Sequence, residues 1–263
     1  MARYQVILSY DGTDYFGFQR QNDQPSVQSA VERSLKQIGW AGTTILSAGR
    51  TDTGVHASGQ VIAFDLNWQH TTEDLLHALN AALPADIAAR QVAQAADDFH
   101  PRFDAASREY EYRILIDPAR DPLHERFCWR VDFPLDVEIL HRASAAFLGR
   151  HDFRAYGNPP RTQGSTVRDV LRSQWLMQDG VYLFAIKANA FLYHMVRRIV
   201  FLQIAAASGK VDVIRFEQTL VNGFDDHPGI APARGLILKE VTYPADGSLR
   251  SRTEVAERNE MDE

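Results

Sequence analysis

The sequence predicts an α+β fold built from two halves that both follow the order β-α-β-β-α-β. The chain has 263 residues, of which 45% are hydrophobic and 24% charged, a balance typical of a globular protein rather than a disordered one. Apolar residues alternate in some segments, as in strands, and recur at helical spacing in others. The order of these segments repeats with additions in the second half, which is typical of paired ferredoxin-like domains.

The first half contains clear start and stop signals for its helices. Val27, Val31 and Leu35 recur at helical spacing, and Gly39 follows as a stop. A second helix opens at Thr71, whose hydroxyl suits a helix N-terminus. Strands are predicted at 4–10, 43–48, 60–66 and 87–95.

The second half repeats this order. Asp179 and Gly180 tolerate the positive backbone angles of a tight turn, so they predict a hairpin. Strands are predicted at 110–116, 127–133, 167–177, 181–188 and 236–243, and helices at 137–148, 191–207 and 211–221. We expect halves at 1–105 and 106–245 that share a mixed, mainly antiparallel sheet with a central cleft, and then a flexible acidic tail at 246–263.

The charge pattern is compatible with a nucleic-acid partner. The net charge is -6, but the segment after Thr253 carries five acidic residues against one arginine, so the remaining chain is near neutral. Only four of the 28 basic residues are lysines. Arginine binds phosphate in a bidentate manner and stacks on bases, which favours RNA, although the codon usage of a GC-rich genome produces the same bias.

Other features indicate a cytoplasmic protein. The only cysteine, Cys128, excludes an intrachain disulfide and a thiolate zinc cluster. The longest apolar stretch, 199–207, is too short to span a membrane. The first residues lead into an alternating pattern rather than the apolar run of a signal peptide.

The segment richest in reactive side chains is 49–57, Gly-Arg-Thr-Asp-Thr-Gly-Val-His-Ala, between two predicted strands. Its glycines permit an unusual backbone path around an arginine, a carboxylate and an imidazole. Thr51 and Asp52 could instead satisfy the amides of an ordinary turn. The triplet that starts at Asp52 also matches aspartic proteases, but their chemistry needs two carboxylates and the chain has one such triplet.

Histidines do not predict a metal site. Their spacing fits no zinc pattern, so we expect no metal at these residues. No cofactor is expected either. The histidines considered are His56, His100, His151, His194 and His227.

The loop and six further blocks resemble the tRNA pseudouridine synthase A family. They lie in the family's order and cover the chain except for its tail. The blocks are YDGTDYFGFQRQ from Tyr10, SVQSAVERSL from Ser26, GRTDTGVHA from Gly49, FHPRFDAASREYEYRI from Phe99, GRHDFRAYG from Gly149, NAFLYHMVRRIV from Asn189 and APARGLILKEVTY from Ala231.

The resemblance implies a pseudouridine synthase fold and a cofactor-independent homodimeric isomerase. Its expected reaction converts uridine to pseudouridine at positions 38, 39 and 40 of the anticodon stem-loop of tRNAs. Two other classes stay open: a non-catalytic protein that binds structured RNA, and a glycosylase that releases free uracil.

The resemblance also implies roles for particular residues. Asp52 matches the nucleophile, Arg197 its ion-pair partner and Arg50 a residue beside the substrate base. A nearby guanidinium would favour the ionised carboxylate that the reaction needs. Arg197 could alternatively belong to the solvated edge of an amphipathic helix, the role that we prefer for Arg198.

The remaining site residues follow from the same matches. Tyr110 matches a tyrosine that stacks on the uracil and takes part in proton abstraction, whereas Tyr112 is expected to be an ordinary strand tyrosine. Leu236 matches an apolar residue under the target ring. RNA contacts are expected from Phe99, His100, Pro101, Arg102 and Phe103, and from Arg161 and Thr162.

Overall fold

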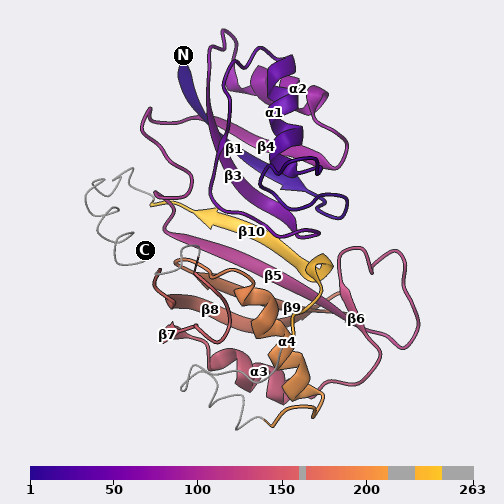
Figure 1. Ribbon diagram of the computed structural model, residues 1–263. Helices are drawn as coiled ribbons and strands as arrows, with labels where there is room; N and C mark the ends of the chain where they lie inside the picture. The colour runs from indigo at the N-terminus through magenta and orange to yellow at the C-terminus, as the bar shows by residue number, and fades with distance from the viewer. Residues whose placement is uncertain (160–163, 213–228, 245–263) are drawn as a thin grey trace. The chain divides into compact units, whose positions relative to one another are not determined.

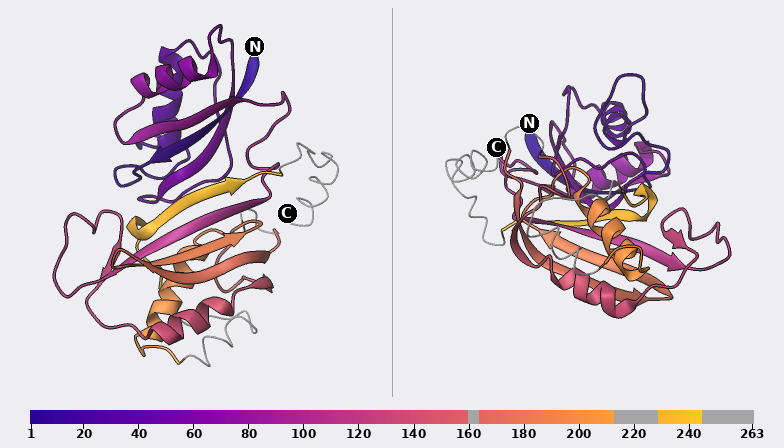
Figure 2. Two further views of the ribbon diagram at one scale, coloured as in Figure 1. Left: turned by 180° about the vertical axis from the view of Figure 1, so that it is seen from behind. Right: turned by 60° about the horizontal axis from the view of Figure 1, so that its bottom comes forward.

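The computed structural model describes residues 1–159, 164–212 and 229–244, and its contacts divide the chain into two compact units. Unit 1 comprises residues 1–106 and the last strand from Ile237 onward, and unit 2 comprises Ser107–Leu236. Both units combine a sheet with helices (Figures 1 and 2). The prediction of an α+β fold with mainly antiparallel strands is confirmed.

Unit 1 follows the predicted order of elements. Strand β1 lies between β4 and β3 and is antiparallel to both, and β2 pairs with the other edge of β3. The elements are β1 (Ala2–Tyr10), α1 (Val27–Gln37), β2 (Leu46–Ser47), β3 (His56–Leu66), α2 (Thr72–Ala82) and β4 (Ile87–Gln94).

Both helices of unit 1 begin at capping boxes, in which a side chain and a backbone N–H three residues apart bond reciprocally. Ser26 and Ser29 cap α1, and Thr71 and Asp74 cap α2. These bonds satisfy N–H groups that the first helical turn leaves without an internal partner. The predicted start at Thr71 is therefore confirmed, and α1 covers the predicted helical repeat of Val27, Val31 and Leu35.

Strand β2 is shorter than the predicted strand 43–48, and β3 begins earlier than the predicted residue 60. The N–H of Ile45 donates to the side chain of Glu32 instead of to a neighbouring strand (3.2 Å). Strand β10 (Leu236–Thr242) lies parallel to β3 at His56 and Ala57, which extends β3 toward the loop that precedes it.

In unit 2 the antiparallel strands follow the order β5-β9-β8-β7, with β6 parallel to β5. Strand β5 pairs with β9 and β9 with β8, much as β1 pairs with β3 and β3 with the two-residue β2 in unit 1. The elements are β5 (Ser107–Ile116), β6 (Trp129–Val131), α3 (Val137–Ala145), β7 (Gly149–Asp152), β8 (Val167–Gln178), β9 (Val181–Ala188), α4 (Met195–Ala207) and the 3-10 turn η1 (Ala233–Gly235).

The predicted hairpin between β8 and β9 is confirmed. Asp179 and Gly180 both have positive φ values, 51° and 79°, as a two-residue hairpin turn of this kind requires. The short strand β7 was not predicted. It pairs with β8 over four residues.

The predicted helix 191–207 is wrong at its start, because α4 begins at Met195. His194 has a left-handed φ of 66°, and the N–H of Tyr193 donates to the carbonyl of Asn158 (2.9 Å). A Cβ on Gly157 would lie 2.5 Å from the carbonyl oxygen of Tyr193, so the chain before α4 packs against that glycine. The predicted helix 211–221 and the acidic tail lie largely or wholly outside the described residues.

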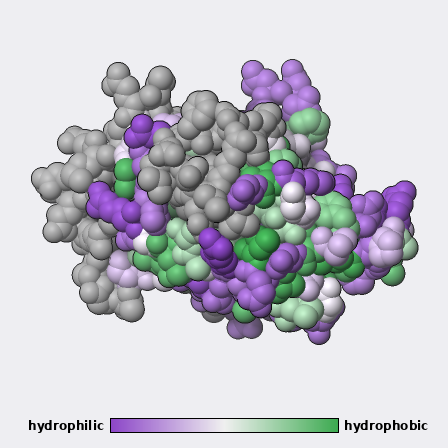
Figure 3. Space-filling model, turned by 90° about the horizontal axis from the view of Figure 1, so that it is seen from below, coloured by the Kyte–Doolittle hydropathy of each residue, from purple (hydrophilic) through white to green (hydrophobic). Residues whose placement is uncertain are grey.

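In the described part of the chain, no helix is both long enough and apolar enough to cross a membrane. The face of the molecule drawn in Figure 3 mixes apolar and polar residues.

Candidate active site

The candidate catalytic loop, residues 48–55, connects β2 to β3 in unit 1. At its start, the N–H of Ala48 donates to the carbonyl of Val61, and the fully buried side chain of Gln60 donates to the carbonyl of Gly49 (3.0 Å). Within the loop, the N–H of Val55 donates to the carbonyl of Asp52 (3.1 Å), which closes a turn. The Arg50 side chain is exposed, and Asp52 is half-buried.

The end of β1 and the segment that follows it contact this loop. The hydroxyls of Tyr10 and Thr51 lie 2.8 Å apart in the buried interior, and the N–H of Phe18 donates to the carbonyl of Thr51 (3.0 Å). A Cβ on Gly12 would lie 2.0 Å from the carbonyl oxygen of Val55. Only glycine permits this approach, so the YDG block is a scaffold for the loop.

His56, at the end of the loop, is buried at 2% exposure. Its Nδ1 atom accepts the N–H of Gly12 (3.0 Å) and lies 3.1 Å from Oδ1 of Asp11. These contacts join β3 to the segment after β1. Among residues 1–159, 164–212 and 229–244, no group of three His, Cys, Asp or Glu side chains is arranged to hold a metal.

Unit 2 carries the tyrosine that the sequence singles out. Tyr110 is a half-buried residue of β5, and its ring meets that of Phe191 edge-on with centroids 5.0 Å apart. Tyr112 is fully buried and donates its hydroxyl hydrogen to the carbonyl of Pro232 (2.7 Å). Burial raises the pKa of Tyr112, although Arg197 and Arg234 act in the opposite direction. The expectation that Tyr112 is a structural strand residue agrees with this environment.

Arg197 lies in the first turns of α4, where it is tied to the segment before β10. Its Nε donates to the carbonyl of Ala231 (2.8 Å), and the N–H of Ala231 donates to the carbonyl of Arg197 (3.1 Å). Leu236 is the first residue of β10 and is 6% exposed. Just before it, a Cβ on Gly235 would lie 2.6 Å from the ring of Tyr112. Unit 2 therefore fixes the backbone that carries Arg197 and Leu236.

The predicted RNA-contacting segment 99–103 is anchored at its first residues. Phe99 is 7% exposed, and its ring packs against Tyr243 with centroids 5.3 Å apart. The hydroxyl of Tyr243 donates to the carbonyl of Pro101 (2.8 Å), and Arg3 donates to the carbonyl of Phe99 (3.0 Å). Phe99 and the buried Pro101 therefore fasten the segment to unit 1.

The other end of this segment is presented to solvent. Arg102 is exposed and Phe103 is 42% exposed, with the guanidinium 5.6 Å from the ring centroid. Between the anchor and this tip, the imidazole Nδ1 of His100 accepts the backbone N–H of Arg102 (3.1 Å). The backbone N–H of His100 donates to the carboxylate of Asp104 (2.7 Å). Burial lowers the pKa of His100, and Asp104 acts in the opposite direction.

Arg161 and Thr162 lie outside the described residues. A hydrogen bond from Thr166 to Asp152 (2.6 Å) joins the chain after these residues to the chain before them. Asp152 also forms an ion pair with Arg154.

Sequence reasoning did not single out Tyr10 or Gln60, which support the loop. A usable signal exists for Gln60, because it precedes the apolar run 61–64 in a buried strand. A buried amide in such a strand needs partners, and here they are backbone groups at Gly49 and Val61. For Tyr10, the sequence contains no comparable signal.

Comparison with known proteins relates most of the chain to one family. A family model described as tRNA pseudouridine synthase matches residues 6–104 and 143–244. The chain belongs to this family. The first match includes Asp52, the second includes Arg197 and Leu236, and Tyr110 lies between them. The predicted membership and the isomerase class that it implies are confirmed.

Relatives in the family cover nearly all of the chain. The tRNA pseudouridine synthase A of Geobacter sp. (strain M21) is 38% identical over 93% of this chain and 100% of its own length. That of Myxococcus xanthus is 37% identical over 92% of each chain. The solved structure titled "Crystal structure of the archaeal box H/ACA sRNP Nop10-Cbf5 complex" matches with a TM-score of 0.39 and 14% identity, over 78% of this chain and 43% of the other.

Proposed function

We propose that this protein isomerises uridine to pseudouridine at positions 38, 39 and 40 of the anticodon stem-loop of tRNA, with Asp52 as the nucleophile. Family membership supports tRNA pseudouridylation. The observation that carries the residue assignment is the loop 48–55, whose backbone is fixed by buried contacts at Thr51 and Gly49 while Arg50 remains exposed. Such a loop presents a carboxylate at a defined position without reorganisation.

The reaction needs a nucleophile or a stabilising negative charge, and a base. The carbon-nitrogen glycosidic bond breaks, the uracil turns, and carbon 5 bonds to the ribose; carbon 5 then loses a proton, and the released nitrogen gains one. Asp52 supplies the nucleophile or the negative charge that stabilises the ribose. The hydroxyl of Tyr110 takes the proton from carbon 5, directly or through water.

The remaining residues keep the carboxylate ionised or contact the RNA. Arg197 pairs with Asp52 during the reaction and keeps the carboxylate ionised. Arg50 lies beside the uracil, and Leu236 supports its ring. Because the target base is stacked in the stem-loop, it must be turned outward at a cost of about a few kcal/mol. The exposed Arg102 and Phe103 contact the RNA at this step, through phosphate and base stacking.

The test uses tRNA that carries tritium at carbon 5 of uridine, because isomerisation releases this hydrogen into water. Wild type is expected to release tritium, and Asp52→Asn to release none while it stays folded and binds tRNA. Asp23→Asn, an exposed carboxylate of the same unit, is the matched control and should retain wild-type release. Wild type that binds without release would support a non-catalytic RNA-binding protein, and free uracil would support a glycosylase.

Three further measurements test the finer assignments. Substrates with a single uridine at position 38, 39 or 40 should all react, and a substrate with cytidine at all three should not. Sedimentation should give a homodimer, and fractionation should find the protein in the cytoplasm.

A further inference from the structure

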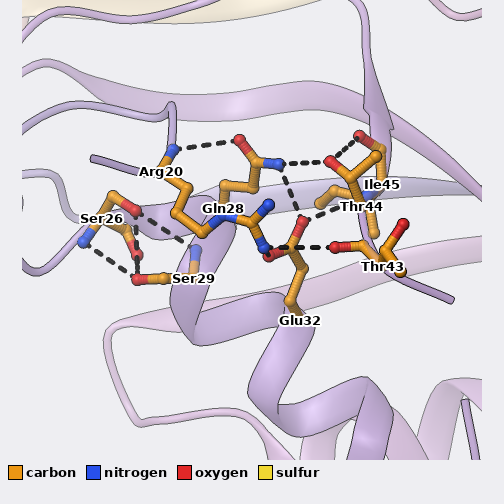
Figure 4. Close-up of polar contacts among 8 residues, drawn as sticks. All are labelled: Arg20, Ser26, Gln28, Ser29, Glu32, Thr43, Thr44 and Ile45. Carbon is orange, nitrogen blue, oxygen red and sulfur yellow. Dashed lines mark hydrogen bonds and ion pairs between the residues drawn. The ribbon is translucent and has the colours of Figure 1, made fainter. Parts of the chain in front are cut away.

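A buried carboxylate that the proposed chemistry does not use lies on α1. Glu32 is 4% exposed, and its Oε1 accepts the Nε2 hydrogen of Gln28 (2.8 Å) and the N–H of Ile45 (3.2 Å). Its Oε2 pairs with Arg20 at 2.7 Å. Figure 4 shows these contacts converging on one side chain. A buried charge is costly unless it is paired and hydrogen-bonded, and this one is both.

Gln28 and Arg20 extend the contacts to two further stretches of chain. The Oε1 of Gln28 accepts the backbone N–H of Arg20 (3.0 Å), and its Nε2 also donates to Oγ1 of Thr44 (2.9 Å). The guanidinium of Arg20 reaches the carbonyl of Thr43 (3.2 Å). Glu32 therefore fastens the chain near residue 20 and the chain at 43–45 to the same helix.

These two stretches lead directly into the supports of the candidate catalytic loop. Two residues before Arg20, the N–H of Phe18 donates to the carbonyl of Thr51 (3.0 Å). Phe18 is itself held by α1, because its carbonyl accepts the N–H of Gln28 (2.9 Å). Shortly after Ile45, the N–H of Ala48 donates to the carbonyl of Val61 at the start of the loop (2.9 Å).

We propose that Glu32 is a positioning residue for the reaction, which holds both supports of the loop and thereby the carboxylate of Asp52. The inference rests on the proposed function of that loop. Small displacements of a reacting group cost up to about 100-fold in rate. A shift of either support, at Thr51 or at Ala48, would move the loop and with it Asp52, without removing any group that touches RNA.

The test replaces Glu32 by an amide of the same shape. Glu32→Gln keeps an acceptor for Ile45 but loses the ion pair with Arg20. We expect the single-turnover rate of tritium release to fall about tenfold, with tRNA affinity within about twofold of wild type. Glu73→Gln, an exposed glutamate on α2, is the matched control and should leave both quantities unchanged. Circular dichroism at the assay temperature measures the folded fraction.

A second variant covers the case in which Glu32→Gln does not fold. Arg20→Lys keeps the positive charge but cannot bridge Glu32 and the carbonyl of Thr43 in the same geometry. It should lower the single-turnover rate in the same way, by about threefold, at wild-type affinity. An unchanged rate in the folded variants would overturn the inference, as would a loss explained by weaker tRNA binding or by the unfolded fraction. Failure of wild type to release tritium would instead overturn the proposed function.

Discussion

The hydroxyl groups of Tyr10 and Thr51 lie 2.8 Å apart in the buried interior of unit 1, although 41 residues separate them in the sequence. Tyr10 is the last residue of β1, and Thr51 immediately precedes the proposed nucleophile. The end of the first strand is therefore joined directly to the loop on which the chemistry is proposed to occur.

The hydrogen bond between Tyr10 and Thr51 should contribute to the free energy of unfolding. In a double-mutant cycle, Tyr10→Phe and Thr51→Val should show a coupling free energy of about 1 kcal/mol, because the pair forms a buried hydrogen bond. Urea unfolding of the two single variants and the double variant measures it. Thr53→Val, exposed in the same loop, should change stability by less than about 0.5 kcal/mol. Strictly additive effects would contradict a direct interaction.

Two glycines near the loop should respond differently to alanine. Gly12→Ala places a methyl group 2.0 Å from the carbonyl oxygen of Val55, so the backbone must move, at a cost of about 1–3 kcal/mol. Gly49→Ala meets nothing within 4 Å and should be within about 0.5 kcal/mol of wild type. Thermal or urea unfolding of the two variants compares them. Equal stabilities would show that the close approach at Gly12 is not maintained in solution.

The segment that carries Arg102 should lose stability in mild acid. Burial lowers the pKa of His100 from its usual value of about 6.5, so the folded segment favours the neutral imidazole. The neutral form accepts the N–H of Arg102 at Nδ1, and protonation removes that acceptor. Its stabilising contribution should be complete above about pH 6.5 and be lost as the pH falls through the lowered pKa.

This prediction is checked by following the His100 ring resonances by NMR from pH 8 to pH 4. His100→Asn keeps a short acceptor and should remove this part of the acid dependence of stability. A ring that titrates at or above its usual pKa would contradict the prediction.

Asp65 should make unit 1 sensitive to stronger acid. Its carboxylate accepts two hydrogen bonds from Arg3, which hold the pKa of Asp65 below its usual value. The contribution is present above about pH 4, the unfolded pKa, and is lost as the pH falls through the lower folded pKa. Because the Asp65 side chain is 41% exposed, we expect no more than about 1 kcal/mol.

Urea unfolding from pH 6 to pH 2.5 tests this contribution. The difference in stability between wild type and Asp65→Asn should shrink toward the acid end. A constant difference for Asp65→Asn would mean that the pair with Arg3 does not stabilise the fold.

Local sequence patterns predicted most of the helices and strands, because caps and turns depend on residues only a few positions apart. The capping threonine at the start of α2 acts on an N–H group three residues away, and the turn at Asp179 depends on two backbone angles. The start of α4 was predicted wrongly for the complementary reason. The residues before Met195 suit a helix, but packing against Gly157 and pairing with Asn158 hold them in another conformation.

By itself, the sequence determined the class of fold, the order of elements and the residues with reactive side chains, because each depends on the chemistry of a residue and its close neighbours. It also carried the blocks that relate the chain to its family. Only the tertiary structure decided what holds the loop of Asp52 in place. The hydroxyl of Tyr10, the missing Cβ of Gly12 and the buried carboxylate of Glu32 meet their partners across distant parts of the chain. Such contacts arise when distant segments pack together, and the spacing of residues within one segment does not specify which segments will pack.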